Sequence, residues 1–472
     1  MKNSSVYDVC IVGAGIAGAT LATYLGRHGV KVAVVEKSMA ERDVIIGELL
    51  QPGGVLKLKE LGLQESLEGI DAQPVLGYGL FMNGENFRIS YPLEDGQAIT
   101  GRGFRNGKFL QRLRQLMLSA PNVTLYEGTV TDLIEGEERI KGVRYTAKED
   151  KEEHVVDARL TVVCDGMFSV FRERLSENKK KVSSYFLGLI LKDAALPYPG
   201  HGHVIVAKPS PCLVYPINST ETRMLIDFPW HEAPRKSPEL TDYVLNIIGP
   251  QLPEELLPSF HAAVTEAKFK VMPNHLIPAT PVFKHGAVLL GDSLNMRHPL
   301  TGGGMTAAFT DVQNLANRLV GIEDFAIEEQ LTEAIQGFYA TRHRQNATIN
   351  ILADALYGVM SNDDLKEACY SYLKLGGAYA QEPIAILSAV SRDRNLLLRH
   401  FFSVALHGAK NIVTGNTQMA AENFTPRQGI SSRIRRSYAM MGKAVEIVSP
   451  LVMNERPGWV IKTALQIGKN VF

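Results

Sequence analysis

The sequence predicts an α/β protein in three parts, and three observations predict it. A continuous apolar run at Val9–Val12 ends in a glycine turn that leads into residues with helical spacing, which indicates a strand followed by a helix. Short apolar runs alternate between about residues 183 and 280, as in an antiparallel sheet. From about residue 349 onward the apolar spacing is helical. With 472 residues, the chain is long enough for two or three domains.

Charge and cysteine content exclude several classes of protein. Lys plus Arg and Asp plus Glu both number 50, so no net charge attracts nucleic acid, and we expect no nucleic acid partner. Four cysteines occur without a CxxC pair, which predicts packing residues in a reducing compartment and no metal site. A first strand near Val6 leads us to expect no signal peptide in the chain as written. No stretch contains the roughly 18 apolar residues that a bilayer-spanning helix needs.

The N-terminal segment has the pattern of a Rossmann-type dinucleotide site. Gly13, Gly15 and Gly18 lie between the first strand and the helix, where glycines permit a tight turn and close approach of the backbone to a pyrophosphate. A second strand, Val32–Val35, ends at Glu36, whose carboxylate is placed to accept ribose hydroxyls. An acid at this position favours an unphosphorylated ribose, so FAD and NAD remain the two candidates.

Two downstream segments favour FAD. An apolar strand at residues 286–290 ends in Gly291 and Asp292, and the glycine-rich stretch Pro299–Met305 leads into another helix. Asp292 can bind the ribityl hydroxyls, while the glycines (Gly302, Gly303 and Gly304) and the helix start bring backbone amides to the flavin ring; NAD has no ribityl chain. A further strand ends at Asp165-Gly166. We therefore expect an FAD site.

The three motifs in this order resemble those of the FAD-dependent monooxygenases of the aromatic-hydroxylase superfamily. Within that superfamily, the strings Gly47–Gly54 and Asn295–Thr306 resemble the signatures of squalene monooxygenase, also called squalene epoxidase. The resemblance covers most of the chain to about residue 410. It implies a Rossmann-type FAD-binding domain beside an antiparallel-sheet substrate domain, with a C-terminal helical region.

The resemblance also implies individual roles. It implies flavin contacts at Ile16, Ala17, Glu36, Lys37, Arg114, Val130, Asp292 and Met305. Relatives usually have an arginine where Val44 stands, and Arg42 is the expected substitute. Tyr78 and Gln51 are expected to form a hydrogen-bonded catalytic pair near the flavin. Pro299, Gly291 and Asp165 complete the expected cofactor loops.

The expected reaction is epoxidation of squalene to 2,3-oxidosqualene with O2, through a flavin C4a-hydroperoxide, in sterol or triterpenoid biosynthesis. The protein has to supply an apolar tunnel that excludes water. The sequence contains no second glycine-rich fingerprint for NADPH, so the implied electron donor is NADPH-cytochrome P450 reductase or an equivalent. Another flavin hydroxylase, a polyprenyl reductase and a non-catalytic lipid carrier of the same fold remain alternatives.

We expect a discontinuous FAD-binding domain at residues 1–72, 101–182 and 284–348, a substrate domain at 73–100 and 183–283, and a helical region at 349–472. Candidate cavity-lining residues are Tyr185, Phe186, Leu187, Leu213, Tyr215 and Phe228. Residues 401–472 contain nine Lys or Arg against three acids, including Arg433, Arg435 and Arg436. This excess suits an anionic membrane surface, the endoplasmic reticulum if the organism is eukaryotic.

Overall fold

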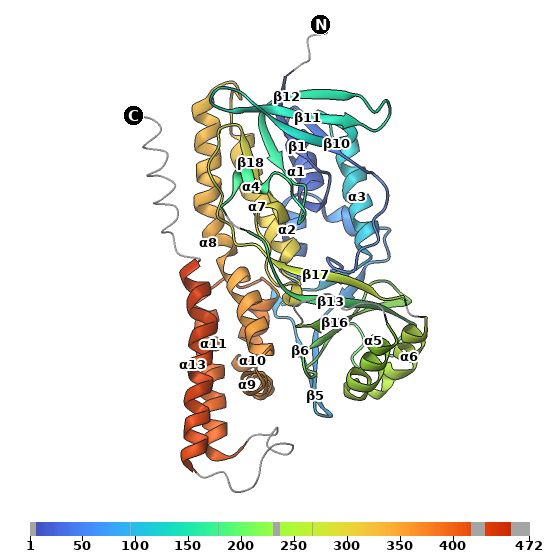
Figure 1. Cartoon of the computed structure of the whole chain (residues 1–472), viewed down its shortest axis with the longest axis vertical. Helices are drawn as coiled ribbons and strands as arrows, with labels where there is room; N and C mark the ends of the chain where they lie inside the picture. The colour runs from blue at the N-terminus through green and yellow to red at the C-terminus, as the bar shows by residue number, and fades with distance from the viewer. Residues whose placement is uncertain are drawn as a thin grey trace.

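The computed structural model describes residues 6–94, 96–177, 179–229, 237–266, 268–416 and 430–454. Its α/β architecture confirms the predicted fold class. Figure 1 shows a sheet-and-helix domain above a second sheet, with a column of helices along one side. Residues 455–472, part of the predicted helical region, lie outside the described residues.

The first domain is built on a six-stranded sheet. Parallel pairing joins β10, β2, β1, β12 and β18, while β11 pairs antiparallel with the extended ends of β10 and β12. The parallel strands are apolar because helices or other strands cover them on both faces. The strands span β1 Tyr7–Val12, β2 Val32–Glu36, β10 Val123–Glu135, β11 Ile140–Ala147, β12 Glu153–Val163 and β18 Ala287–Leu289.

Helices cover this sheet. The helix after the glycine turn, α1, packs against α3 and α7, and α7 packs in turn against α2 and α8. Apolar side chains of these helices and of the parallel strands form one continuous core. The helices span α1 Ile16–Arg27, α2 Pro52–Glu60, α3 Asn106–Ser119, α4 Arg172–Leu175, α7 Gly304–Val320 and α8 Glu328–Met360.

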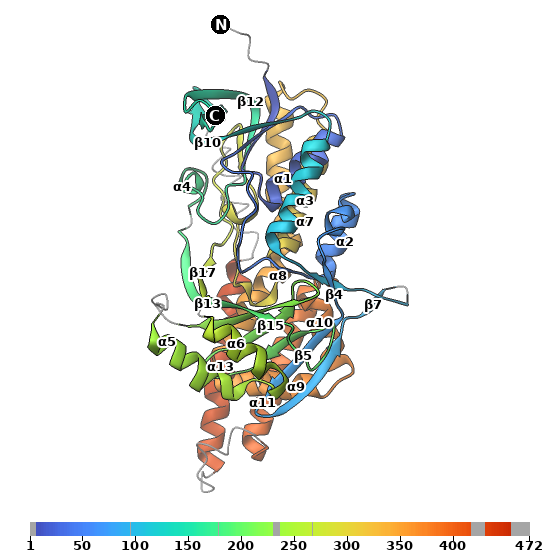
Figure 2. The ribbon, with the colours of Figure 1, turned by 90° about the vertical axis from the view of Figure 1, so that its right-hand side faces the viewer.

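The second domain contains a seven-stranded sheet in the order β17-β13-β16-β15-β14-β5-β6. All neighbours pair antiparallel except β14 and β5, which are parallel. Helices α5 Pro238–Tyr243 and α6 Leu257–Thr265 lie on one side of it (Figure 2). The strands span β5 Gly77–Met82, β6 Glu85–Ser90, β13 Lys181–Lys192, β14 Gly202–Ile205, β15 Cys212–Pro216, β16 Glu221–Phe228 and β17 Lys270–Leu276.

The two faces of this sheet pack into different cores. Phe186, Leu213 and Tyr215 belong to the core shared with the C-terminal helices, whereas Leu187 and Phe228 pack into the core beneath α5 and α6, against which Tyr185 also packs. Side chains alternate between faces along a strand. The prediction that all six line one cavity was therefore wrong. Only Phe186, Leu213 and Tyr215 face the C-terminal helices.

Helix α8 passes without interruption through the expected domain boundary at residues 348 and 349. It is followed by α9 Asp363–Lys374, α10 Ala378–Leu387, α11 Arg394–Thr414 and α13 Ile430–Asn454. Helices α11 and α13 pack side by side and extend away from the sheets (Figure 1). None of the helices in the described ranges combines the length and hydropathy of a bilayer-spanning segment.

Candidate active site

The predicted cofactor loops meet at one edge of the parallel sheet. Glu36 is the last residue of β2, and the glycine turn, Asp165 and Gly291 follow the carboxyl ends of β1, β12 and β18. Backbone hydrogen bonds join these loops: Gly13 donates to Val35 at 2.8 Å, and Leu290 donates to Val163 at 3.0 Å. A Cβ at Gly291 would lie 3.0 Å from the Ala17 side chain. The two glycine motifs, far apart in sequence, are therefore in contact.

The glycine turn has the local geometry that a pyrophosphate requires. Gly13 has a φ of +97°, and a Cβ there would lie 2.8 Å from the Cys164 carbonyl. A Cβ at Gly18 would lie 2.0 Å from the Gly13 carbonyl, so this glycine permits close packing of the helix on the turn. A Cβ at Gly15 would meet no atom within 4 Å. No side chain caps α1, so its first amides remain donors for an anion.

The buried Glu36 and Arg114 form a polar cluster beside this turn with Arg42, whose side chain is exposed. One Glu36 oxygen accepts the Ala14 amide at 2.7 Å, and the other lies 3.2 Å from Arg42. Arg114 is 1% exposed, donates to the Ala14 carbonyl at 2.9 Å and lies 3.5 Å from Glu36. Desolvation lowers the pKa of Arg114, and the Glu36 carboxylate opposes that shift. The structure thus places Arg42, the expected substitute for the arginine missing at Val44, against Glu36.

Two expected contacts lie at the margin of this cluster. Lys37 is exposed next to Glu36. Val130 lies three residues beyond the point where Glu127 of β10 pairs with Glu36, in the part of the strand that pairs with β11, and its side chain is partly buried against the main core. Their expected contact with flavin stays a prediction.

Arg172 connects the remaining two loops, and the sequence analysis did not assign it to the site. It is 4% exposed, and its guanidinium donates to the carbonyls of Ser293 at 2.7 Å, Asp292 at 3.1 Å and Gly166 at 3.1 Å. The position of Arg172 shortly after Asp165 was the signal in the sequence that could have assigned it to the site. Its bonds to Asp292 and Ser293, about 120 residues away, cannot be inferred from sequence spacing.

Asp292, for which we expect contact with the ribityl chain, lies in the turn directly after β18. Its side chain is exposed, yet desolvation by the surrounding protein raises its pKa, an effect that Arg297 and Arg172 partly offset. After the short turn Pro299–Thr301, Gly302 adopts a left-handed conformation and α7 begins at Gly304, where a Cβ would again meet nothing within 4 Å. Met305 is buried in the core at 8% exposure. The start of α7 therefore offers backbone amides beside Asp292.

Gln51 and Tyr78 are hydrogen bonded, as expected, and the bond belongs to a larger cluster. The Gln51 amide donates to the Tyr78 hydroxyl at 2.6 Å and to the Thr301 carbonyl at 2.7 Å, while the Tyr91 hydroxyl donates to Gln51 at 2.8 Å. Burial raises the pKa of both tyrosines. The cluster, whose Tyr91 the sequence analysis missed, thus joins β5 of the second sheet to the turn that precedes α7. Because Tyr78 accepts from Gln51, its own proton is available for donation.

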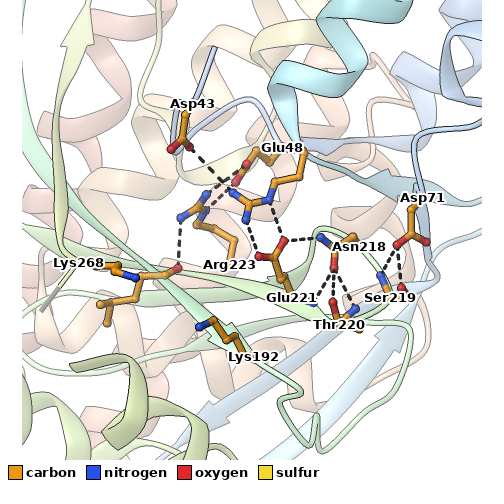
Figure 3. A network of polar contacts seen from close by, with 12 residues as sticks. Asp43, Glu48, Asp71, Lys192, Asn218, Ser219, Thr220, Glu221, Arg223 and Lys268 are labelled. Atoms are coloured by element: carbon orange, nitrogen blue, oxygen red, sulfur yellow. Dashed lines mark hydrogen bonds and ion pairs between the residues drawn. The ribbon is translucent and has the colours of Figure 1, made fainter. Parts of the chain in front are cut away.

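The loop that carries Arg42 is tied to the second sheet by ion pairs (Figure 3). Arg223 and Glu48, 2% and 1% exposed, lie 2.6 Å apart, and Arg105 binds Glu221 through two nitrogens at 2.9 and 2.6 Å. Desolvation raises the pKa of Glu48, and Arg223 opposes that shift. A cavity of about 320 Å³ is lined by residues of this loop together with Arg105 and Glu221. Its lining mixes acids and bases, so it is not complementary to an anion.

The residues at the sheet edge fit FAD. Uncapped amides of α1 and the open space at Gly15 suit the pyrophosphate, Glu36 suits the ribose, and Asp292 with the start of α7 suits the ribityl chain and flavin ring. Fold and site together define an FAD-dependent oxidoreductase.

Comparison with known proteins is more specific. The squalene epoxidase family model matches residues 157–423, and an FAD dependent oxidoreductase model matches residues 8–42. A squalene monooxygenase from Panax ginseng is 47% identical over 86% of this chain and 76% of its own length. Squalene monooxygenase from Mus musculus is 39% identical over 95% of this chain and 78% of its own length. Squalene epoxidase from Schizosaccharomyces pombe is 38% identical over 95% of this chain and 98% of its own length. The chain belongs to the squalene epoxidase family.

Solved structures share the fold at lower identity. Klebsiella pneumoniae HpxO, solved with FAD and uric acid, superimposes with a TM-score of 0.66 at 20% identity, over 82% of this chain and 98% of that one. Pseudomonas aeruginosa pqsL, a probable FAD-dependent monooxygenase, superimposes with a TM-score of 0.64 at 22% identity, over 78% of this chain and 100% of that one. These similarities support the FAD-dependent monooxygenase fold.

Proposed function

We propose that this chain epoxidises squalene to 2,3-oxidosqualene with O2, through a flavin C4a-hydroperoxide, in sterol or triterpenoid biosynthesis. FAD supplies the chemistry that activates oxygen, and the protein positions the cofactor and keeps water away. The observation that carries the proposal is the Gln51 cluster. It connects the turn before α7 to the core between the seven-stranded sheet and the C-terminal helices, where Tyr78, Leu213 and Tyr215 are buried among apolar side chains.

The decisive experiment is incubation of the purified protein with squalene, FAD, NADPH, a cytochrome P450 reductase and ¹⁸O2. The expected product is oxidosqualene with one labelled oxygen. The matched control is Asp292→Ala, which is expected to lose FAD during purification because the ribityl anchor is gone. Wild-type protein that retains FAD but forms no epoxide would contradict the substrate assignment.

The proposed electron donor is a separate reductase, because the single glycine-rich fingerprint serves FAD. In a stopped-flow assay, NADPH alone is expected to leave the flavin oxidised, and added reductase is expected to bleach it. Rapid reduction by NADPH alone would favour a hydroxylase that takes hydride directly.

The proposed location is a membrane surface, that of the endoplasmic reticulum in a eukaryote. Leu406, Ile430 and Tyr438 on α11 and α13 are 60%, 71% and 75% exposed, and Arg435 is exposed nearby in sequence. Arg436 instead forms an ion pair with Asp364 at 3.0 Å. Its positive charge is therefore neutralised within the protein, and fewer basic side chains are left for a lipid surface than the sequence indicates. Exposed apolar and basic side chains suit binding to anionic lipid.

Flotation with phosphatidylcholine vesicles, with and without phosphatidylserine, tests this location. The double variant Leu406→Glu/Tyr438→Glu is expected no longer to float with the vesicles. The matched control is Val155→Glu on β12, at a site that is 45% exposed, and it is expected to float as the wild type does. Equal flotation of both variants and the wild type would remove α11 and α13 from the proposed contact.

A further inference from the structure

A buried hydrogen-bonded chain joins the seven-stranded sheet to the start of the FAD loop. Ser184 on β13 donates to Asp227 on β16 at 2.6 Å, and its oxygen lies 2.9 Å from His298 Nε2. Asn274 on β17 donates to the same serine oxygen at 2.8 Å. The exposures of Ser184, Asp227 and His298 are 0%, 2% and 1%.

The contacts determine which nitrogen of His298 carries the proton. The Leu300 amide donates to Nδ1 at 3.3 Å, so Nδ1 is an acceptor and the neutral ring carries its proton on Nε2. The Ser184 hydroxyl gives its only proton to Asp227, so it accepts from both His298 and Asn274. Burial lowers the pKa of His298 to about 3, which keeps the ring neutral.

The order of the chain excludes a nucleophilic role. In a hydrolytic triad the histidine lies between the serine and the acid and takes the serine proton. Here the serine lies between the other two, donates to the acid and accepts from the histidine. The aromatic rings around His298 also hold it still, because Tyr357 stacks on it at 3.8 Å between ring centroids and Phe186 meets its edge at 5.8 Å.

We propose that His298, Ser184 and Asp227 are positioning residues that fix the FAD loop Pro299–Gly304 relative to the seven-stranded sheet. His298 caps the turn Pro299–Thr301 at its start through the Leu300 amide, and Gln51 binds the Thr301 carbonyl at its end. The two contacts hold the turn from both sides, so the backbone that carries Gly302 to Gly304 is kept in one place. This inference depends on FAD binding and not on the identity of the oxidised substrate.

Two substitutions of His298 separate the two halves of the chain. In His298→Asn, the side-chain oxygen can still accept the Leu300 amide, but the side chain is too short to reach Ser184. In His298→Gln, the terminal amide can reach Ser184 while the cap is lost. Each is expected to weaken FAD binding to the apoprotein about fivefold to tenfold, the effect of one lost hydrogen bond, and to alter the visible circular dichroism of bound FAD.

Ser183 provides the matched control, because its hydroxyl donates to the Asn274 carbonyl at 2.9 Å and does not touch His298. Ser183→Ala is expected to bind FAD as the wild type does. Ser184→Ala is expected to weaken FAD binding. Because Ser184→Ala and His298→Asn remove the same hydrogen bond, the double variant is expected to bind FAD about as tightly as whichever single variant binds it less tightly. Wild-type affinity and spectrum in His298→Asn, or additive losses in the double variant, would overturn the proposal.

The same preparations keep the test independent of global stability. Thermal unfolding of each apoprotein is recorded beside its FAD titration. A loss of affinity in a variant whose apoprotein unfolds at the wild-type temperature supports positioning, and a loss seen only in unfolded preparations refutes it. None of these measurements uses squalene, so their failure is distinguishable from failure of the proposed reaction.

Discussion

Replacement of Gly15 by alanine should separate FAD binding from folding. Gly15 has φ −75° and ψ −170°, an extended conformation that alanine adopts without strain, and the added Cβ meets no protein atom within 4 Å. The apoprotein is therefore expected to gain about 0.4–1 kcal/mol of stability from the lost freedom of the unfolded chain. The methyl group would, however, occupy the space through which a pyrophosphate approaches the first turn of α1.

The cost to FAD follows from the hydrogen bonds at that helix terminus. A hydrogen bond to a charged phosphate contributes about 1.5–3 kcal/mol, so the loss of one weakens binding roughly tenfold to more than a hundredfold. Fluorescence-quenching titration of the apoprotein with FAD measures this, and urea unfolding of the apoprotein measures stability. Gly15→Ala with wild-type affinity would refute the placement of the pyrophosphate.

Gly18→Ala is the matched control. Its Cβ would lie 2.0 Å from the Gly13 carbonyl and 3.2 Å from the Ile11 side chain, so the backbone has to move. We expect it to destabilise the apoprotein by about 1–3 kcal/mol or more, whereas Gly15→Ala does not.

Three further changes test the contacts around the site. Gln51→Met should destabilise the apoprotein by at least about 2 kcal/mol in urea unfolding, because three buried polar groups lose their partner; a loss below about 1 kcal/mol would contradict this. Glu48→Met should cost about 3–5 kcal/mol by leaving Arg223 as an unpaired buried charge, and adding Arg223→Met should recover part of that loss; a double variant no more stable than the single would count against it. Burial raises the pKa of Asp227 from 3.8 to about 6, so the folded protein binds this proton more tightly than the unfolded chain does. The stability of the folded protein therefore falls as the pH rises through the range between those two values. The stability of Asp227→Asn relative to wild type should therefore rise by roughly 3 kcal/mol from about pH 4 to about pH 7, and a pH-independent difference would exclude the shift.

The cofactor loops could be predicted because their signals are local. The glycine turn, Glu36, Asp165 and Asp292 each lie at or just after the end of an apolar strand, and the carboxyl ends of parallel strands lie at one edge of a sheet. The contacts between loops could not be predicted in the same way. The bonds of Arg172 to the loop after β18 and of His298 to Ser184 join residues more than 100 positions apart.

Helix α8 shows a second reason for incomplete prediction. Arg342, Asn346 and Asn350 are four residues apart and all buried, so the face that packs inward contains polar residues. Apolar periodicity is then weak, and the predicted helix began at about residue 349 although α8 starts at Glu328. The opposite faces of the second sheet are a third case, because consecutive apolar residues do not say which side chains face the C-terminal helices and which face α5 and α6.

The continuity of α8 constrains how this protein can be altered. Arg342 binds Asp311 of α7 at 3.0 Å, and Tyr357, 15 residues later, stacks on His298. About 22 Å of helix separates the two contacts, and one inserted residue would rotate everything after it by about 100°. Tyr357 would then face away from His298 while Arg342 kept its partner. Insertions and deletions should therefore be far less tolerated between these two residues than in the loops that flank the helix.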